Sequence, residues 1–312
     1  MRAGIARRAL LGAALATPAL AEKLFAPLRT VLRDSARNRD IPVLFRPALT
    51  GRPAPTVILS HGLGGSRDGL SWLGEALAEA GFAALQLQHP GSDGAIYAAG
   101  ADRFAATARA LTPTAALDRL RDIAFAINTT AARAPDWGID PLKFALAGHS
   151  YGAWAVQKAV GERLPGTTGQ GLGLPDARVL AAIAMSPSPP QGLPPALAFA
   201  PVATPVLHLT GTQDDGRIEG IEAAARRIPY DGISRAPQML AVLEGADHFA
   251  FAGEGPEWLQ ARSAPFTPRA AALSVLFLRA FLRGDAAARA TLAQGRVRPP
   301  LDPLDRYEAK GF

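Results

Sequence analysis

The sequence predicts an α/β protein built on one doubly wound, mostly parallel sheet. Short apolar runs without strict polar alternation recur along the chain, and helical patterns of apolar side chains separate them. Parallel strands that are covered on both faces have this continuous apolar character. Their alternation with helices indicates a sheet with helices on both sides. The 312 residues, 48% of them hydrophobic and 19% charged, are sufficient for one domain with a sizeable core.

The first 21 residues have the pattern of an export signal, so we expect a single folded domain over residues 22–312. Arg7-Arg8 precede an apolar stretch at 9–16, and Ala19–Ala21 forms a small-x-small cleavage site. The stretch is too short for a permanent membrane span, and paired arginines are typical of the twin-arginine export route. An amphipathic helix packed on the domain is the alternative. The signal interpretation predicts a periplasmic or secreted protein without a stable membrane anchor.

The predicted strands share a short length and an apolar character, and the predicted helices share a helical spacing of apolar side chains. The strands are Val43–Arg46, Thr56–Ser60, Phe82–Leu87, Lys143–Ala147, Val179–Met185, Pro205–Thr210 and Gln238–Leu243. The helices are Ser71–Ala80, Pro113–Ala132, Tyr151–Leu164 and Arg269–Arg283, and the last is expected to close the ordered part of the chain. Thr112 is a suitable N-cap before Pro113 in the first turn. Stretches rich in proline and glycine at 165–175 and 186–205 predict surface loops.

The sequence GHSYG at 148–152 lies where a predicted strand ends and a predicted helix begins. A sharp strand-to-helix turn would hold the Ser150 side chain outward, and glycines at 148 and 152 would let the backbone close that tightly. The helix dipole at this position favours developing negative charge. We therefore predict that Ser150 is a nucleophile, and a serine that only shapes a turn is the alternative.

A serine hydroxyl needs a base to accept its proton, and His248 is the predicted base. For a nucleophile in this kind of turn, the expected order along the chain is serine, acid, histidine. Only His208 and His248 follow Ser150, and His208 lies inside an apolar strand, where a packed core imidazole is expected. His248 follows the last predicted strand, on a segment that can reach the edge of the sheet.

The predicted acid is Asp214, in the segment TGTQDDG that continues the strand Pro205–Thr210. Its role would be to hold His248 in the required tautomer and to stabilise the imidazolium. Asp215 is the reserve candidate, and either aspartate can instead merely shape a turn. Asp247 is adjacent to His248 in the sequence and is not preferred.

Acyl transfer also needs donors for an oxyanion, typically two backbone N–H groups. We expect one from Tyr151, directly after the nucleophile, and one from Leu63 in the glycine-rich segment HGLGGS that follows the strand Thr56–Ser60. His61 is expected to brace this segment by hydrogen bonds and to lie beside the substrate.

The ordered set SHGLGGSRDG, HPGSD, AGHSYGA, AMSP, TGTQDD and GADHF resembles the α/β-hydrolase fold. Within it the chain is most similar to bacterial predicted dienelactone hydrolases and platelet-activating-factor acetylhydrolase-like esterases, from about Arg39 to Arg283. The resemblance implies a secreted serine hydrolase that cleaves carboxylic esters through an acyl-enzyme. Two positions depart from these families, because dienelactone hydrolases carry a cysteine at the position of Ser150 and no carboxylate follows the strand that ends at Met185. The acid is then expected after the next strand, as in many bacterial lipases and polyester hydrolases.

The segment between Met185 and Pro205 is short for a helical cap domain, so a large cap is not expected and the cleft should be open or shallow. Such a cleft suits short-chain esters, of about two to six acyl carbons, or the ends of a polyester, because it buries few methylenes. The side chains expected to line it are Leu63, Tyr151, Trp154 and Met185.

Composition argues against several other functions. The chain has no cysteine, which excludes disulfides, thiolate nucleophiles and cysteine-based metal sites. No pair of histidines has helical ligand spacing, so neither a metal nor another cofactor is expected. The formal net charge of +6 comes mostly from scattered arginines, which disfavours a nucleic-acid partner. The expected partner is a small-molecule or polymeric ester substrate. The alternative functions are an acyltransferase or thioesterase, or an inactive scaffold that binds a ligand or partner. The oligomeric state is not predicted.

Overall fold

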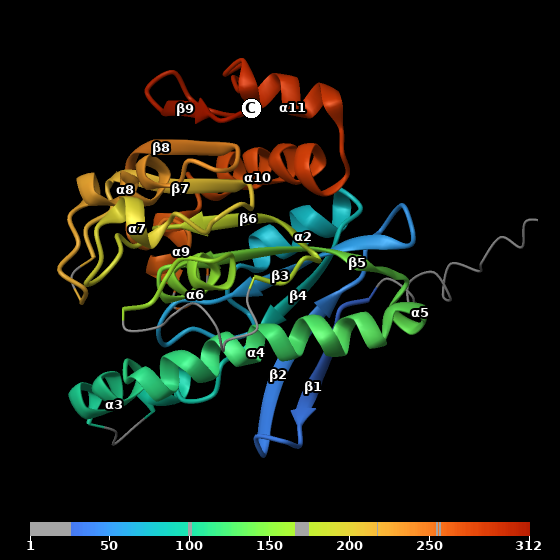
Figure 1. Cartoon of the computed structure of the whole chain (residues 1–312). Coiled ribbons are helices and arrows are strands. Elements are labelled where there is room, and N and C mark those ends of the chain that lie inside the picture. Colours follow the sequence, from blue (N-terminus) through green and yellow to red (C-terminus); the bar gives the residue numbers. More distant parts are fainter. Residues whose placement is uncertain (1–25, 99–101, 166–174, 217, 254, 256) are drawn as a thin grey trace, which may run out of the picture.

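A computed structural model describes residues 26–98, 102–165, 175–216, 218–253, 255 and 257–312 (Figure 1). The predicted export signal lies outside these described residues. None of the helices in the described part of the chain combines the length and the apolar character needed to cross a membrane.

A nine-stranded mixed sheet forms the centre of the molecule, with the strand order β1-β2-β4-β3-β5-β6-β7-β8-β9. The six strands from β4 to β8 in this order are parallel, whereas β1, β2 and β9 are antiparallel to their neighbours. The strands are β1 (Leu28–Asp34), β2 (Arg39–Arg46), β3 (Ala54–Ser60), β4 (Ala83–Leu87), β5 (Ile139–His149), β6 (Val179–Met185), β7 (Val206–Gln213), β8 (Gln238–Asp247) and β9 (Arg306–Lys310). The predicted α/β class with a mostly parallel sheet is confirmed.

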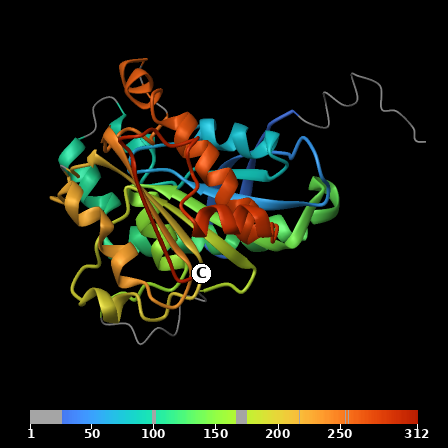
Figure 2. The same cartoon turned by 90° about the horizontal axis from the view of Figure 1, so that it is seen from above.

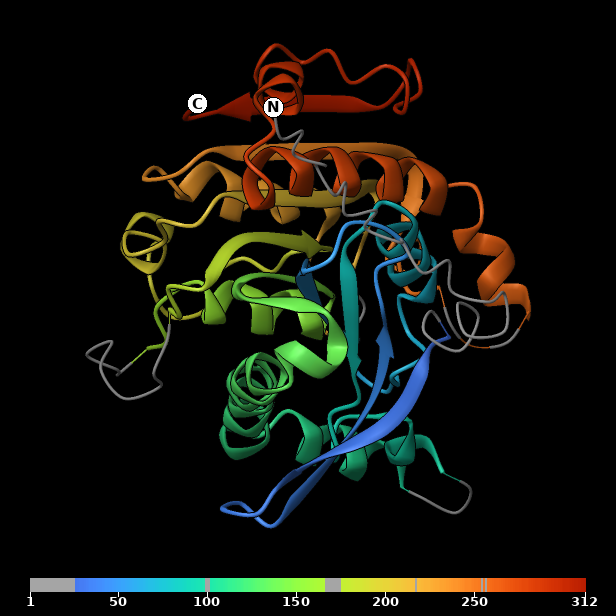
Figure 3. The same ribbon diagram turned by 90° about the vertical axis from the view of Figure 1, so that its right-hand side faces the viewer.

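Helices cover both faces of the sheet (Figures 2 and 3) and enclose two apolar cores. On one face, α4 (Pro113–Ala132), α5 (Ala134–Trp137) and α6 (Tyr151–Ala159) contribute to one core. On the other face, α2 (Ser71–Glu79), α10 (Thr267–Leu282) and α11 (Ala286–Ala293) contribute to the second. The remaining elements are α3 (Arg103–Ala110), α7 (Pro195–Ala198), α8 (Ile228–Gly232), α9 (Glu257–Ser263) and the 3-10 turns η1 (Gly94–Tyr97) and η2 (Ala223–Arg227).

The boundaries of α4 confirm the predicted helix, including its cap. The Thr112 hydroxyl accepts a hydrogen bond from the Ala115 N–H at 3.3 Å, as an N-cap should. The helix predicted from Tyr151 is shorter than expected, because α6 ends at Ala159 and Gly161 then adopts a φ of 113°.

Three expectations of the fold are wrong. The strand predicted at Val43–Arg46 lies within β2, but it is antiparallel to both of its neighbours and not parallel as its apolar run indicated. The chain does not end its ordered part at Arg283, because α11 follows and β9 pairs with β8 at the edge of the sheet. The segment predicted as a surface loop at 186–205 contains α7 and buries Phe199 in the core.

Candidate active site

Ser150 occupies a tight turn between β5 and α6. Its backbone has a φ of 54° and a ψ of −117°, a conformation that is strained for a residue with a side chain. A Cβ atom on Gly148 would lie 2.4 Å from the backbone of Gly152, and a Cβ on Gly152 would lie 1.9 Å from the Ser60 carbonyl oxygen. Since such contacts are not tolerated, this turn requires glycine on both sides of the serine.

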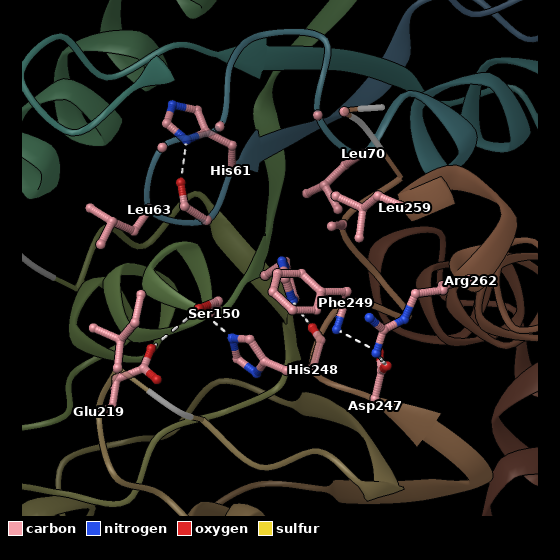
Figure 4. A pocket seen from close by; sticks show the side chains of 18 of the residues that line it. His61, Leu63, Leu70, Ser150, Glu219, Asp247, His248, Phe249, Leu259 and Arg262 are labelled. Atoms are coloured by element: carbon pink, nitrogen blue, oxygen red, sulfur yellow. Dashed lines mark hydrogen bonds and ion pairs between the residues drawn. The ribbon is translucent and has the colours of Figure 1, made fainter. Parts of the chain in front are cut away.

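His248 lies within hydrogen-bonding distance of this serine (Figure 4), and Asp214 lies within hydrogen-bonding distance of His248. His248 Nε2 is 2.9 Å from Ser150 Oγ, and His248 Nδ1 is 2.8 Å from Asp214 Oδ1. The second carboxylate oxygen of Asp214 accepts a hydrogen bond from the Thr210 hydroxyl at 2.7 Å. Because a carboxylate only accepts hydrogen bonds, Nδ1 carries the proton and Nε2 presents its lone pair to the serine.

The two neighbouring aspartates differ in their surroundings. Asp214 is fully buried, and burial by itself would raise the pKa of its carboxyl. The hydrogen bond from His248 and the positive charge of Arg226 outweigh burial and hold this pKa below its ordinary value. Asp215 is exposed, and its Oδ1 accepts a hydrogen bond from the Ala223 N–H at 2.8 Å. Asp214 is therefore the carboxylate that can orient His248.

Arg226, on η2, is a buried cation beside this carboxylate and was not singled out in the sequence. Its Nε donates to the Asp214 carbonyl at 3.1 Å and lies 3.5 Å from Asp214 Oδ1. Its Nη1 donates to the carbonyls of Ser186 and Pro187 at 3.2 and 3.3 Å. Arg226 thus ties the end of β7 to the end of β6 and fixes the backbone that carries the acid.

His149 holds the backbone of His248 in position. Its Nε2–H donates to the His248 carbonyl at 2.8 Å, and the two ring centres are 5.2 Å apart. Burial and the charge that His248 can carry lower the pKa of His149 to about 3. His149 therefore stays neutral and acts as a hydrogen-bond donor.

The segments that carry the predicted oxyanion donors flank the serine. Tyr151 begins α6, and a Cβ on Gly62, next to Leu63, would lie 3.5 Å from Ser150 Cβ. Within the described part of the chain, neither the Leu63 N–H nor the Tyr151 N–H donates to a protein acceptor. Both groups are free to bind an oxygen of a ligand.

A buried array of Ser60, His89 and Asp122 lies next to the loop that follows β3 and carries Leu63. His89 Nε2 is 3.0 Å from Ser60 Oγ, and His89 Nδ1 is 3.0 Å from Asp122 Oδ2. Arg39 makes a bidentate hydrogen bond to Asp122 at 2.8 and 2.9 Å. Burial alone would raise the pKa of Asp122, but the hydrogen bonds from His89 and Arg39 hold it at about 2.

Two further side chains connect the buried array to the loop. His61 accepts a hydrogen bond from the His89 N–H at 3.0 Å and donates to the Gly62 carbonyl at 2.6 Å, in the bracing role expected for it. Arg119 is fully buried and donates to Ser60 Oγ at 3.2 Å and to the His61 carbonyl. Its guanidinium lies 4.6 Å from the centre of the Tyr151 ring. Burial lowers the pKa of Arg119 to about 10, so it remains charged at neutral pH.

A cavity of about 1110 Å³ opens onto Ser150 and His248. His61 and Leu63 line it, as expected, and its further apolar lining comes from Leu70, Tyr97, Ile218, Phe249, Trp258 and Leu259. In the described residues, no three histidine, cysteine, aspartate or glutamate side chains are grouped as a metal site would require.

Three side chains expected in the cleft lie elsewhere. Met185 is fully buried in a core, and its carbonyl instead accepts the Ser150 N–H at 2.9 Å. Trp154 packs against the opposite core, beside the ring of Tyr151, whose hydroxyl donates to the Ala110 carbonyl. The expectation failed because both Trp154 and Tyr151 point from α6 toward the body of the protein.

The sequence matches no known family model, and no curated protein is significantly similar to it.

Proposed function

We propose that this chain is a serine hydrolase of the α/β-hydrolase fold that cleaves carboxylic esters through an acyl-enzyme. One observation carries the proposal: Ser150 Oγ, on a strained strand-to-helix turn beside a cavity, is 2.9 Å from Nε2 of an imidazole whose other nitrogen is 2.8 Å from a buried carboxylate. A nucleophile, a base and a group that orients the base are the parts that acyl transfer needs.

In the acylation step, Ser150 Oγ attacks the ester carbonyl carbon as His248 Nε2 takes the hydroxyl proton. The Asp214 carboxylate stabilises the imidazolium that forms. The carbonyl oxygen becomes an oxyanion and accepts hydrogen bonds from the N–H groups of Leu63 and Tyr151. The tetrahedral intermediate then collapses, the bond to the alcohol oxygen breaks, and His248 protonates the departing alcohol.

In the deacylation step, water takes the place of the alcohol. His248 removes a proton from the water, whose oxygen attacks the acyl carbon, and the same N–H groups stabilise the second oxyanion. Collapse breaks the bond to Ser150 Oγ, which recovers its proton from His248 and releases the carboxylic acid. No metal or cofactor takes part in these steps.

Labelling and turnover by matched variants test the proposal. The protein should hydrolyse p-nitrophenyl butyrate, and a fluorophosphonate should form a covalent adduct at Ser150, read by mass spectrometry of its peptides. Ser150→Ala should lower kcat by about 10⁴ to 10⁶, because the three residues act as a unit, and should abolish the adduct. An adduct on folded Ser150→Ala protein, or undiminished turnover by it, would refute the assignment.

A further inference from the structure

Glu219 places a carboxylate next to the nucleophile, and no step of the proposed mechanism uses it. Its Oε1 lies 3.5 Å from Ser150 Oγ (Figure 4), the long limit of a hydrogen bond. The serine has one proton to donate, and His248 Nε2, at 2.9 Å, is the better acceptor. The Glu219 carboxylate is therefore left to interact with whatever occupies the cavity.

The loop after β7 holds Glu219 in this position. Gly216 and Ile221 exchange two backbone hydrogen bonds, of 2.7 and 3.1 Å, which close the loop at its base. A Cβ on Gly216 would lie 2.5 Å from both Glu219 Oε2 and Arg226 Nη2, so the absence of a side chain there leaves room for the carboxylate beside the guanidinium. Glu219 is exposed and lines the cavity, on the side of Ser150 away from Asp247 (Figure 4).

The other charged residues of the cavity are arranged differently. Asp247 forms an ion pair with Arg262, whose guanidinium also lies 5.6 Å from the centre of the Phe249 ring. Asp215 accepts the Ala223 N–H, and Arg103 enters the wall from the start of α3. Among these described groups, only the Glu219 carboxylate reaches the hydroxyl that would attack the substrate.

Aromatic and aliphatic side chains form much of the remaining wall, including Phe249 and Trp258. Aromatic faces attract alkylammonium groups, and a nearby carboxylate adds Coulomb attraction. The same carboxylate repels an anionic group on a substrate. The wall thus combines apolar contact with a negative charge at the point of reaction.

We propose that Glu219 makes this an ester site that prefers cationic substrates, whose ammonium group lies a few bonds from the ester carbonyl. The proposal rests on the hydrolase function proposed above and specifies its substrate class.

Two esters of the same shape measure this preference. Butyrylcholine carries a quaternary ammonium, and 3,3-dimethylbutyl butyrate replaces it with a neutral tert-butyl group. The wild-type protein should favour butyrylcholine by about tenfold in kcat/KM, and the ratio should fall at about 1 M salt, where the screening length is about 3 Å. Glu219→Gln should bring the ratio close to one. Glu222→Gln removes the same charge from a residue that does not line this cavity, and should keep the wild-type ratio.

The outcomes separate the two proposals. Equal hydrolysis of both esters by the wild type, or a ratio that Glu219→Gln leaves unchanged, overturns the cation preference while the hydrolase function stands. Equal losses in Glu219→Gln and Glu222→Gln also overturn it, because the effect is then one of net charge. If neither ester is cleaved and the fluorophosphonate does not label Ser150, both proposals fail.

Discussion

The molecule contains two serine–histidine–aspartate arrays with nearly the same hydrogen-bond distances. In the open array, His248 is 2.9 Å from Ser150 and 2.8 Å from Asp214. In the buried array, both distances from His89 are 3.0 Å, to Ser60 and to Asp122. Each array also has a fully buried arginine beside it. Hydrogen-bond geometry alone therefore does not identify a nucleophile.

The arrays differ in what surrounds the hydroxyl. Ser150 has a φ of 54° and lines the cavity, and His248 is 15% exposed. Ser60 and His89 are buried and do not line this cavity, and the Ser60 oxygen accepts a hydrogen bond from a charged guanidinium. A hydroxyl oxygen bound to a cation is a poorer nucleophile, since its lone pair is already engaged. Access and a free lone pair distinguish the open array.

The buried array supports the loop that faces the open one. Arg119 joins Ser60 to the His61 carbonyl, and His61 accepts a hydrogen bond from the backbone of His89. This loop carries the Leu63 N–H. We therefore expect changes in the buried array to affect stability first and turnover second.

Replacing the aspartate of each array by asparagine should give the largest contrast between the two arrays. Asp214→Asn should lower kcat by about 10⁴, because His248 is left in the wrong tautomer, and should also lower the free energy of unfolding, because Asp214 is buried beside the Arg226 cation. Asp122→Asn should lower the free energy of unfolding by about 3 kcal/mol, because it breaks a buried ion pair, while kcat of the folded protein falls less than tenfold. Steady-state kinetics and urea titrations measure the two quantities.

Asp215→Asn is the matched control for the open array, since it changes the adjacent carboxylate, which does not contact His248. Its kcat should stay within about tenfold of the wild type, far from the loss expected when a triad member is removed. If Asp215→Asn proves more damaging to kcat than Asp214→Asn, the acid of the open array has been wrongly assigned.

Sequence reasoning reached the open array because its parts have local signals. Ser150, Asp214 and His248 each follow an apolar run and stand in short glycine-containing segments. The edge strands lack such runs. β1 has no buried residue before Leu32 and leaves Val31 45% exposed, and β9 is the polar sequence RYEAK. Continuous apolar runs, which are typical of parallel strands covered on both faces, therefore do not predict either edge strand.

The buried array and the charges around the open one have no local signal. Arg119 is fully buried, and its partner Ser60 lies 59 residues away in the chain, so nothing next to Arg119 in the sequence distinguishes it from the exposed arginines. The approach of Glu219 to Ser150 depends on how the loop after β7 closes through Gly216. These contacts are set by tertiary packing, which neither periodicity nor spacing encodes.

Lowering the pH should reduce the free energy of unfolding through the buried array. Burial and the charge of Arg119 lower the pKa of His89 to about 4, below the 6.5 of an unfolded histidine. Between these pH values the unfolded chain binds more protons, so this contribution is present above pH 6.5 and is lost as the pH falls toward 4. The loss amounts to as much as about 3 kcal/mol. Urea titrations from pH 7.5 to 4.5 should show a shallower decline for His89→Gln, and an unchanged slope would contradict the assignment.

Removing the buried hydroxyl should have a smaller effect. Ser60→Ala leaves His89 and Arg119 without one partner each, at a cost of about 1 to 3 kcal/mol in the free energy of unfolding. Turnover should fall less than tenfold, and the fluorophosphonate should still label Ser150. A loss of more than a hundredfold in kcat at unchanged stability would mean that the buried array takes part in the chemistry.

The smallest expected effect concerns access to the open array. Because the cavity is open, the rate should depend only gradually on acyl length. The segment 186–204 contains α7, which buries Ala198 in a core, and none of its residues lines the cavity, so it does not cover Ser150. The rim residues Ile218 and Trp258 are 61% and 58% exposed. Each added methylene should therefore gain less than the 0.8 kcal/mol of full burial, or less than about fourfold in kcat/KM. Rates for p-nitrophenyl esters from acetate to octanoate, followed through the solubility limit of the longest, should change smoothly. A sharp rise at the emulsion boundary would mean that Ser150 is covered in solution, and the difference in access between the two arrays would then disappear.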